Sequence, residues 1–242
     1  MSALLQLAAL IAAVLLGATT QRVTGLGFAL VSSPLLVLVL GPFQGVLLAN
    51  LLSLVANVVV LAMTWRMVEV RRALTLALPA LLMVPPGALV ARTLPAPLLQ
   101  IVIGALVILA MLLSRYGGRW FAVRGTAGAV GAGAASGFMN ATAGVGGPAL
   151  ALYAIGSRWE HRKFVASAQL YFAVVNVGSV LAKGLPSVGA GRLLSALVAL
   201  GVGIVIGQRL TARVRPASAM RAVVALSVAG AAATVLKGAL TW

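Results

Sequence analysis

Six apolar runs in this sequence are each long enough to cross a lipid bilayer. They cover residues 45–65, 73–92, 97–114, 164–183, 192–208 and 219–238. A helix rises about 1.5 Å per residue, so about 17–25 residues cross a hydrocarbon core of about 30 Å. In lipid a spanning segment must satisfy its own backbone N–H and C=O groups, and a helix does so. The runs therefore predict an all-α polytopic membrane protein.

The composition supports a bilayer environment and excludes several partners. Hydrophobic residues make up 62% of the chain and charged residues 8%, whereas about a quarter of a soluble domain is charged. The net charge of +16 would suit a nucleic acid, but the basic residues form short clusters between apolar runs, where they act as topology signals. We therefore predict the lipid bilayer and no nucleic acid as a partner.

Two further apolar regions, residues 3–40 and 126–156, are interrupted by polar residues and glycines. The interruptions cover residues 21–27 and 140–148. The arms that follow them, 28–40 and 149–156, are too short to cross the bilayer. Each region is therefore predicted to be a broken, re-entrant helical hairpin. Charge alone does not separate re-entry from a pair of full crossings.

The polar positions and glycines of the chain recur at an offset of 119 residues. The matched pairs are Gln21 with Asn140, Gly25 with Gly144, Gly27 with Gly146, Asn50 with Gln169, and Asn57 with Asn176. The pattern predicts a first repeat at 1–114, a cytoplasmic linker at 115–125 and a second repeat at 126–242. Such weak internal symmetry in an apolar chain is typical of transporters whose site lies between two repeats.

The basic residues predict how the two repeats are oriented. If both broken regions re-enter, 13 of the 18 basic residues fall on one face and 4 on the other, with Arg22 at a hairpin tip. Single crossings would give about 9 against 8, so the positive-inside rule favours re-entry and puts both termini outside the cytoplasm. Each half then has a hairpin and three crossings, so the repeats are inverted. Trp65, Trp120 and Trp159 would form an interfacial aromatic belt.

The two interruptions are the strongest candidates for a binding site. Helix amino ends at membrane depth present free N–H groups and a positive dipole end, which suit an anion. Glycines let the backbone approach a ligand, or merely allow helices to pack closely. The candidate backbone donors are Gly25, Gly27, Gly144, Gly146 and Gly147.

Polar side chains near the interruptions extend this candidate site. Arg22 would supply charge, or would simply extend to the membrane surface. Asn50, Ser53 and Asn57 share one helix face, and could bind the substrate oxyanion, line its path or hydrogen-bond neighbouring helices. The same interpretations apply to Gln169, Tyr171 and Asn176, while Thr24, Asn140 and Thr142 would join the site or cap the broken arms.

The sequence has few groups suited to catalysis. There is no Asp or Cys, and Glu69, Glu160 and His161 lie in predicted loops. We therefore predict no enzyme, no metal site, no cofactor and no buried carboxylate proton relay. A negative cell interior pushes anions outward by about 2.3 kcal/mol per charge per 100 mV. The chain thus fits an anion exporter driven by membrane potential or by an ion gradient.

Both interruptions resemble a known family. Residues 137–148, with the sequence GFMNATAGVGGP, resemble the second glycine motif of the sulfite exporter TauE/SafE family of bacterial membrane permeases, and residues 24–28 with 34–36 are similar to its first motif. Phe28 stands where another glycine often follows, and Gln21 and Arg22 just upstream suggest a subgroup with a different substrate. The resemblance implies an inner-membrane exporter of sulfite or a small organosulfonate.

Two other functions are compatible with the same residues. One is an anion channel on the same scaffold, and the other is a non-transporting membrane assembly protein whose glycines only pack helices. A homo-oligomer is compatible with the pattern as well. Without the resemblance, composition and spacing indicate only a transporter that is compatible with a small anionic substrate.

Overall fold

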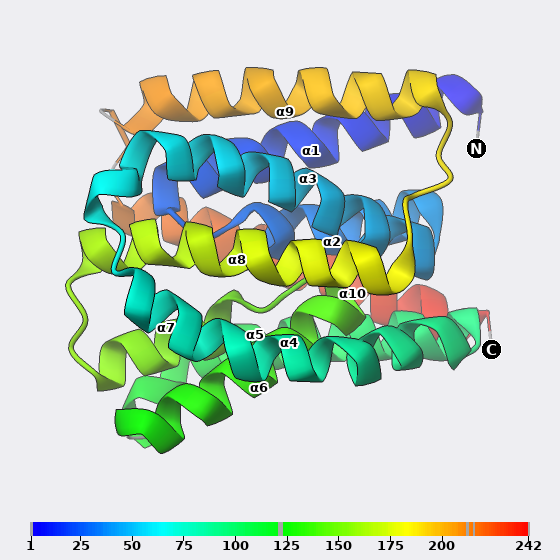
Figure 1. Ribbon diagram of the computed structural model, residues 1–242. Coiled ribbons are helices and arrows are strands. Elements are labelled where there is room, and N and C mark those ends of the chain that lie inside the picture. Colours follow the sequence, from blue (N-terminus) through cyan, green and yellow to red (C-terminus); the bar gives the residue numbers. More distant parts are fainter. Residues whose placement is uncertain (1, 121–122, 212, 215, 242) are drawn as a thin grey trace.

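The computed structural model describes residues 2–120, 123–211, 213–214 and 216–241, and these are built of helices without a strand (Figure 1). The helices of the first half are α1 (Ala3–Thr24), α2 (Phe28–Leu40), α3 (Pro42–Thr64), the short η1 (Trp65–Met67), α4 (Val70–Thr93) and α5 (Ala96–Trp120). Those of the second half are α6 (Gly125–Ala143), α7 (Gly147–Gly156), α8 (His161–Lys183), α9 (Ala190–Thr211) and α10 (Pro216–Leu240).

Within the described residues, seven segments are long and apolar enough to cross a membrane. Six of them, in α3, α4, α5, α8, α9 and α10, coincide with the six predicted crossings in position, length and apolar composition. The seventh is α1, the first arm of a predicted hairpin, which at 22 residues is long enough to cross by itself. The helices α2 and α7 are apolar but have only 13 and 10 residues. The chain is therefore a multi-pass membrane protein in which each broken region has a long arm and a short arm.

Each break follows a glycine in the left-handed conformation. Gly25 (φ 83°) ends α1 and Gly144 (φ 76°) ends α6, and their N–H groups donate to the carbonyls of Gln21 and Asn140. Glycine adopts this conformation without the steric cost of a Cβ, so it stops a helix cleanly. After α6 the next helix begins at Gly147, with Pro148 in its first turn.

The long arm of each broken region packs along a helix of the other half. Thr19 Oγ1 of α1 donates to the carbonyl of Gly203 in α9, and Thr142 Oγ1 of α6 donates to the carbonyl of Gly87 in α4, each over 3.2 Å. Figure 1 shows α1 with α9 on one side of the bundle and α4 with α6 on the other, with α3 and α8 between them. The colour gradient shows that α3 and α8 run in opposite directions.

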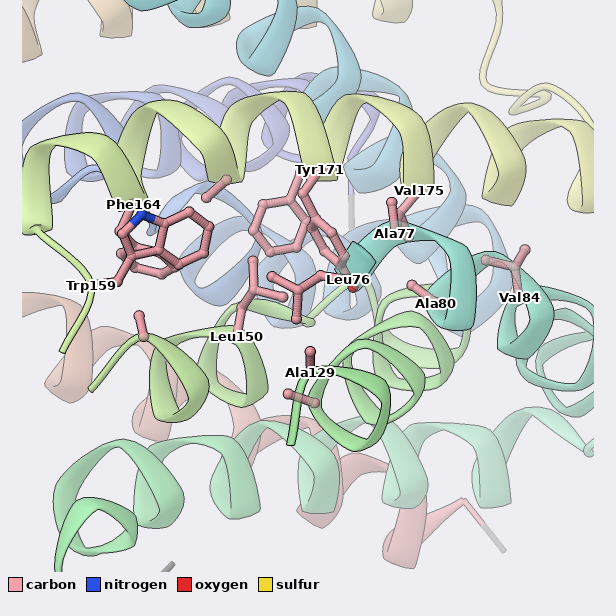
Figure 2. Packing of buried hydrophobic residues seen from close by; sticks show 14 of the residues in the cluster. Leu76, Ala77, Ala80, Val84, Ala129, Leu150, Trp159, Phe164, Tyr171 and Val175 are labelled. Carbon is pink, nitrogen blue, oxygen red and sulfur yellow. The ribbon is translucent and has the colours of Figure 1, made fainter. Parts of the chain in front are cut away.

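A hydrophobic cluster joins α4, α7 and α8 beside the second break. Figure 2 shows Leu76 of α4 beside Leu150 of α7 and Tyr171 of α8, and Ala80 of α4 belongs to the same cluster. Trp159 belongs to this cluster and is 8% exposed, with its ring centroid 5.6 Å from that of Phe164.

The prediction that Trp159 belongs to an interfacial belt is therefore wrong. The segment before α8 contacts the start of α4, where the guanidinium carbon of Arg72 lies 5.1 Å from the Trp159 ring centroid. Trp65 is exposed, as a belt residue would be. The side chain of Trp120 lies outside the described part of the chain.

The contact between α4 and α6 depends on glycines. A Cβ at Gly133 would overlap the carbonyl of Leu76, and a Cβ at Gly137 would overlap the carbonyl of Ala80. A small residue at these positions is what lets two helix backbones approach closely in a membrane. The α6 arm, which ends at the second break, is thereby fixed against the other half.

Replacing Gly137 by Ala should destabilise the protein by about 1–3 kcal/mol, because the new methyl group has to push two backbones apart. We expect a lower thermal unfolding temperature in detergent. Gly131→Ala is the matched control: Gly131 lies on the same helix, and its Cβ would meet no atom within 4 Å. That variant should unfold at or above the wild-type temperature. Equal stability of the two variants would contradict this account of the interface.

Candidate functional site

A cavity of about 40 Å³ lies between the two breaks. It has room for about three water molecules, at about 10–15 Å³ each. Both halves of the chain contribute to its wall. The lining residues are Gln21, Leu26, Phe28, Ala29, Leu30, Ser53, Asn57, Asn140, Gly144, Val145, Gly146, Gly147, Phe172 and Asn176.

The amino ends of both short helices form part of this wall. Phe28, Ala29 and Leu30 open α2, and Gly147 opens α7. Neither helix has a side-chain cap on its first turn. Because the first N–H groups of a helix have no partner inside the helix, they remain available to a solute. Two positive dipole ends thus face one small space.

A pair of amide side chains borders each break. Gln21 Nε2 donates to Asn57 Oδ1 over 3.0 Å, and Asn140 Nδ2 donates to Asn176 Oδ1 over 3.0 Å. These four residues line the cavity and are buried. The two bonds join positions that correspond at the 119-residue offset, so the same interaction occurs once in each half.

Other side chains satisfy the carbonyl ends of the broken helices from across the site. Gln169 Nε2 donates to the carbonyl of Gly25 over 3.1 Å, and Asn50 Nδ2 donates to that of Asn140 over 3.3 Å. Ser33 Oγ donates to the carbonyl of Ala143 over 2.6 Å. Each donor comes from the half opposite to the break that it contacts. The carbonyl ends are therefore occupied, whereas the amide ends are open.

Two polar atoms of lining residues have no partner in the described structure. They are Oε1 of Gln21 and Oγ of Ser53, and each side chain belongs to a residue that is 6% exposed. An unsatisfied buried polar atom costs about 1–3 kcal/mol. Both atoms are therefore suited to hydrogen-bond a solute or water in the cavity.

The structure brings several predicted site residues to the cavity. Asn57, Asn140, Gly144, Gly146, Gly147 and Asn176 line it. Asn50, Gln169 and Gly25 lie immediately behind it, in the hydrogen bonds just described, and Gly27 precedes the first residue of α2.

Four predicted residues have other positions. Thr24 Oγ1 donates to the carbonyl of Thr20, and Thr142 Oγ1 donates to that of Gly87. Tyr171 is buried in the cluster of Figure 2, where its hydroxyl donates to the carbonyl of Gly133 over 3.4 Å. Arg22 is the fourth.

Arg22 lies in the last turn of α1 and faces α9. A Cβ added to Gly207 of α9 would lie 2.6 Å from the Cβ of Arg22, so the two helices are in close contact there. The carbonyl of Arg22 accepts a 3.5 Å hydrogen bond from Thr211 Oγ1. Successive helix residues point about 100° apart, so Gln21 points to the cavity and Arg22 points to the neighbouring helix. The structure does not place Arg22 in the cavity wall.

Ser53 also lines the cavity, on the helix face that it shares with Asn57, whereas Gln21, Phe28 and Phe172 line it but were not predicted as site residues. A signal existed for Gln21, because it matches Asn140 at the repeat offset. Nothing in the sequence distinguishes the two phenylalanines from ordinary packing residues.

A double-mutant cycle tests the buried amide pair of the first half. We expect Gln21→Ala and Asn57→Ala each to destabilise the protein, with a coupling of about 0.5–3 kcal/mol because the two side chains bond each other. The measurement is the free energy of unfolding in detergent for both single variants and the double variant. Asn57→Ala combined with Ser195→Ala, a half-buried serine of α9 that bonds only its own helix in the described structure, should be additive. Additivity in the Gln21 cycle would contradict the hydrogen bond.

Comparison with known protein families identifies one match that covers nearly the whole chain. The family described as "Sulfite exporter TauE/SafE" matches over residues 9–235, which include both breaks and every residue of the cavity wall. No curated protein and no solved structure is significantly similar to the chain. The breadth of the family match means that this chain belongs to the sulfite exporter TauE/SafE family, a family of membrane transporters.

Proposed function

We propose that the protein exports sulfite, or a small organosulfonate or related organic anion, across the bacterial inner membrane. The observation that carries the proposal is the cavity into which two uncapped helix amino ends open. Gly147, where a Cβ would meet no atom within 4 Å, keeps the backbone accessible there, and Ser53 adds a free hydroxyl. Backbone N–H groups at helix amino ends bind oxyanions without a fixed counter-charge.

The distribution of acidic residues agrees with an anionic substrate. Glu69 forms ion pairs with Arg72 and Lys163, and Glu160 pairs with Lys163. None of these residues lines the cavity, and the chain has no other acidic side chain. A solute of negative charge thus meets amide donors and no carboxylate.

The arrangement of the breaks supports alternating access between two inverted repeats. The breaks occur at matched positions, α3 and α8 run antiparallel, and each break is contacted by a side chain of the other half. In inverted-repeat transporters, one half moves against the other around a fixed site near the midplane. We infer that the termini, which lie at one end of the bundle in Figure 1, face away from the cytoplasm.

The membrane potential is sufficient to drive the proposed export. At 100 mV, inside negative, a dianion gains about 4.6 kcal/mol on leaving the cell. Because each 1.4 kcal/mol is a factor of ten, this corresponds to a concentration ratio of about a thousand. An ion gradient is the other driving force that we consider.

In proteoliposomes we expect sulfite flux that saturates with concentration and increases with an outwardly directed electrical driving force. The measurement is sulfite efflux at set potassium diffusion potentials, with protein-free vesicles as the control. Flux that does not saturate, together with unitary currents, would identify a channel instead. If neither sulfite nor any small sulfonate or carboxylate moves, a non-transporting role would replace the proposal.

Filling the cavity should abolish anion binding without unfolding the protein. A Cβ at Gly147 meets no atom within 4 Å and would extend into the cavity. We expect Gly147→Leu to weaken sulfite binding at least about tenfold, which is about 1.4 kcal/mol, as measured by titration calorimetry in detergent.

Two controls accompany this variant. Gly201→Leu adds the same side chain at an exposed and equally open glycine of α9, and Arg22→Ala removes the cation that faces α9. Both should bind sulfite within about twofold of wild type. Unchanged binding in Gly147→Leu would place the substrate elsewhere, and a large loss in Arg22→Ala would bring that residue into the site.

A further inference from the structure

Lys183 is a buried cation at the far end of α8. It is 4% exposed, and its Nζ donates to the carbonyl of Ala141 over 2.8 Å. Ala141 lies in the last turn of α6, next to Asn140 of the cavity wall. The ammonium group therefore contacts the carbonyl end of the helix that stops at the second break.

No acidic side chain lies near this ammonium group. The chain has only Glu69 and Glu160, and Glu160 precedes the first residue of α8 whereas Lys183 is its last residue. At about 1.5 Å per residue, the length of α8 puts them about 33 Å apart. Glu69 bonds Lys163 at that same distant end. The ionisable side chain whose charge interacts with Lys183 is Arg92, which is another cation.

A buried charge needs a compensating group. The carbonyl end of α6 supplies part of it, because a helix carries a partial negative charge at its carboxyl end. In turn, the ammonium group cancels the negative end that would otherwise lie beside the cavity. The positive amino ends of α2 and α7 then dominate the potential there.

The face of α8 that carries Lys183 leads to the cavity. Asn176 lines the cavity, and Ser179 accepts a 3.4 Å bond from Asn140 Nδ2. Lys183 follows four residues later, so these side chains share one helix face. The position that corresponds to Lys183 in the first half is Thr64, whose hydroxyl donates to the carbonyl of Val60. The cation therefore occurs in one half only.

We propose that Lys183 is the residue that makes the cavity selective for anions, by placing a positive charge behind the carbonyl end of α6. The proposal rests on the proposed function and deepens it, since it concerns the same cavity. Lys183 does not line the cavity, so it acts on the substrate through the electric field rather than by contact. The field favours a dianion over a monoanion of similar shape.

The test compares variants that separate charge from hydrogen bonding. Lys183→Gln removes the charge but keeps an N–H donor for the carbonyl of Ala141, Lys183→Met removes both, and Lys183→Arg keeps the charge. The matched control is Lys237→Met, because Lys237 Nζ also donates to a carbonyl near the end of a helix, that of Leu38 in α2, but is exposed. Binding of sulfite, sulfoacetate and methanesulfonate is measured by titration calorimetry in detergent, with thermal unfolding as the check on folding.

We expect both neutral variants to lose at least about tenfold in affinity for the dianion sulfoacetate, and less for the monoanion methanesulfonate. Lys183→Arg should stay within about threefold of wild type, and Lys237→Met within about twofold. A merely structural lysine would change both anions equally, and that result would overturn the proposal. So would an unchanged affinity in Lys183→Gln.

Two outcomes distinguish a failure of the role of Lys183 from a failure of the proposed function, and a third covers variants that do not fold. If wild type binds none of the three anions, the proposed function fails and the role of Lys183 fails with it. If wild type binds them and the folded neutral variants bind equally well, only the role of Lys183 is overturned. If neither neutral variant folds, the wild-type comparison decides: equal affinity for dianion and monoanion contradicts a positive charge behind the cavity, and preference for the dianion supports it.

Discussion

Every backbone N–H and C=O group in a membrane interior needs a partner, and the two broken helices leave several without one inside the helix. The C=O groups at the breaks have side-chain partners, whereas the N–H groups do not. Side chains donate to the carbonyl ends, from Gln169 to Gly25 and from Asn50 to Asn140, and no side chain caps the amide ends of α2 and α7. A site whose backbone carbonyl ends accept bonds and whose helix amino ends have no side-chain cap offers backbone donors to an acceptor, and a small oxyanion consists almost entirely of acceptors.

This difference also explains why the two halves must pack against each other. A half by itself cannot satisfy its own break, because Gln169 belongs to the second half and serves the first break, while Asn50 does the reverse. The glycines at Gly133 and Gly137 let α6 approach α4 closely enough to fix the second break. Close helix packing therefore accounts for Gly133 and Gly137, whereas Gly147, where a Cβ would meet no atom within 4 Å, remains available to the proposed anion site.

Much of this could be predicted from the sequence, because length and periodicity decide how a chain crosses lipid. The six crossings and the two breaks follow from apolar runs and from Gly25 and Gly144, whose left-handed conformations few other residues adopt. The direction of a single side chain was harder to predict. Arg22 and Gln21 are adjacent, and only the rotation of α1 against α9 decides which of them reaches the cavity. Trp159 was misplaced for a similar reason, because the fold of a short connecting segment has no periodic signal.

The two breaks are held unequally, which bears on how the site could change state. The carbonyl end of α6 accepts bonds from Asn50, Ser33 and Lys183, all buried. The end of α1 accepts one from Gln169 and a longer, exposed one from Thr211. Segments with fewer buried contacts open at lower free energy. Rearranging the first break should therefore require less free energy than rearranging the second. A transporter that alternates by moving one half against the other would then keep the α6 end, with its cation, as the fixed element and move the α1 end around the bound anion.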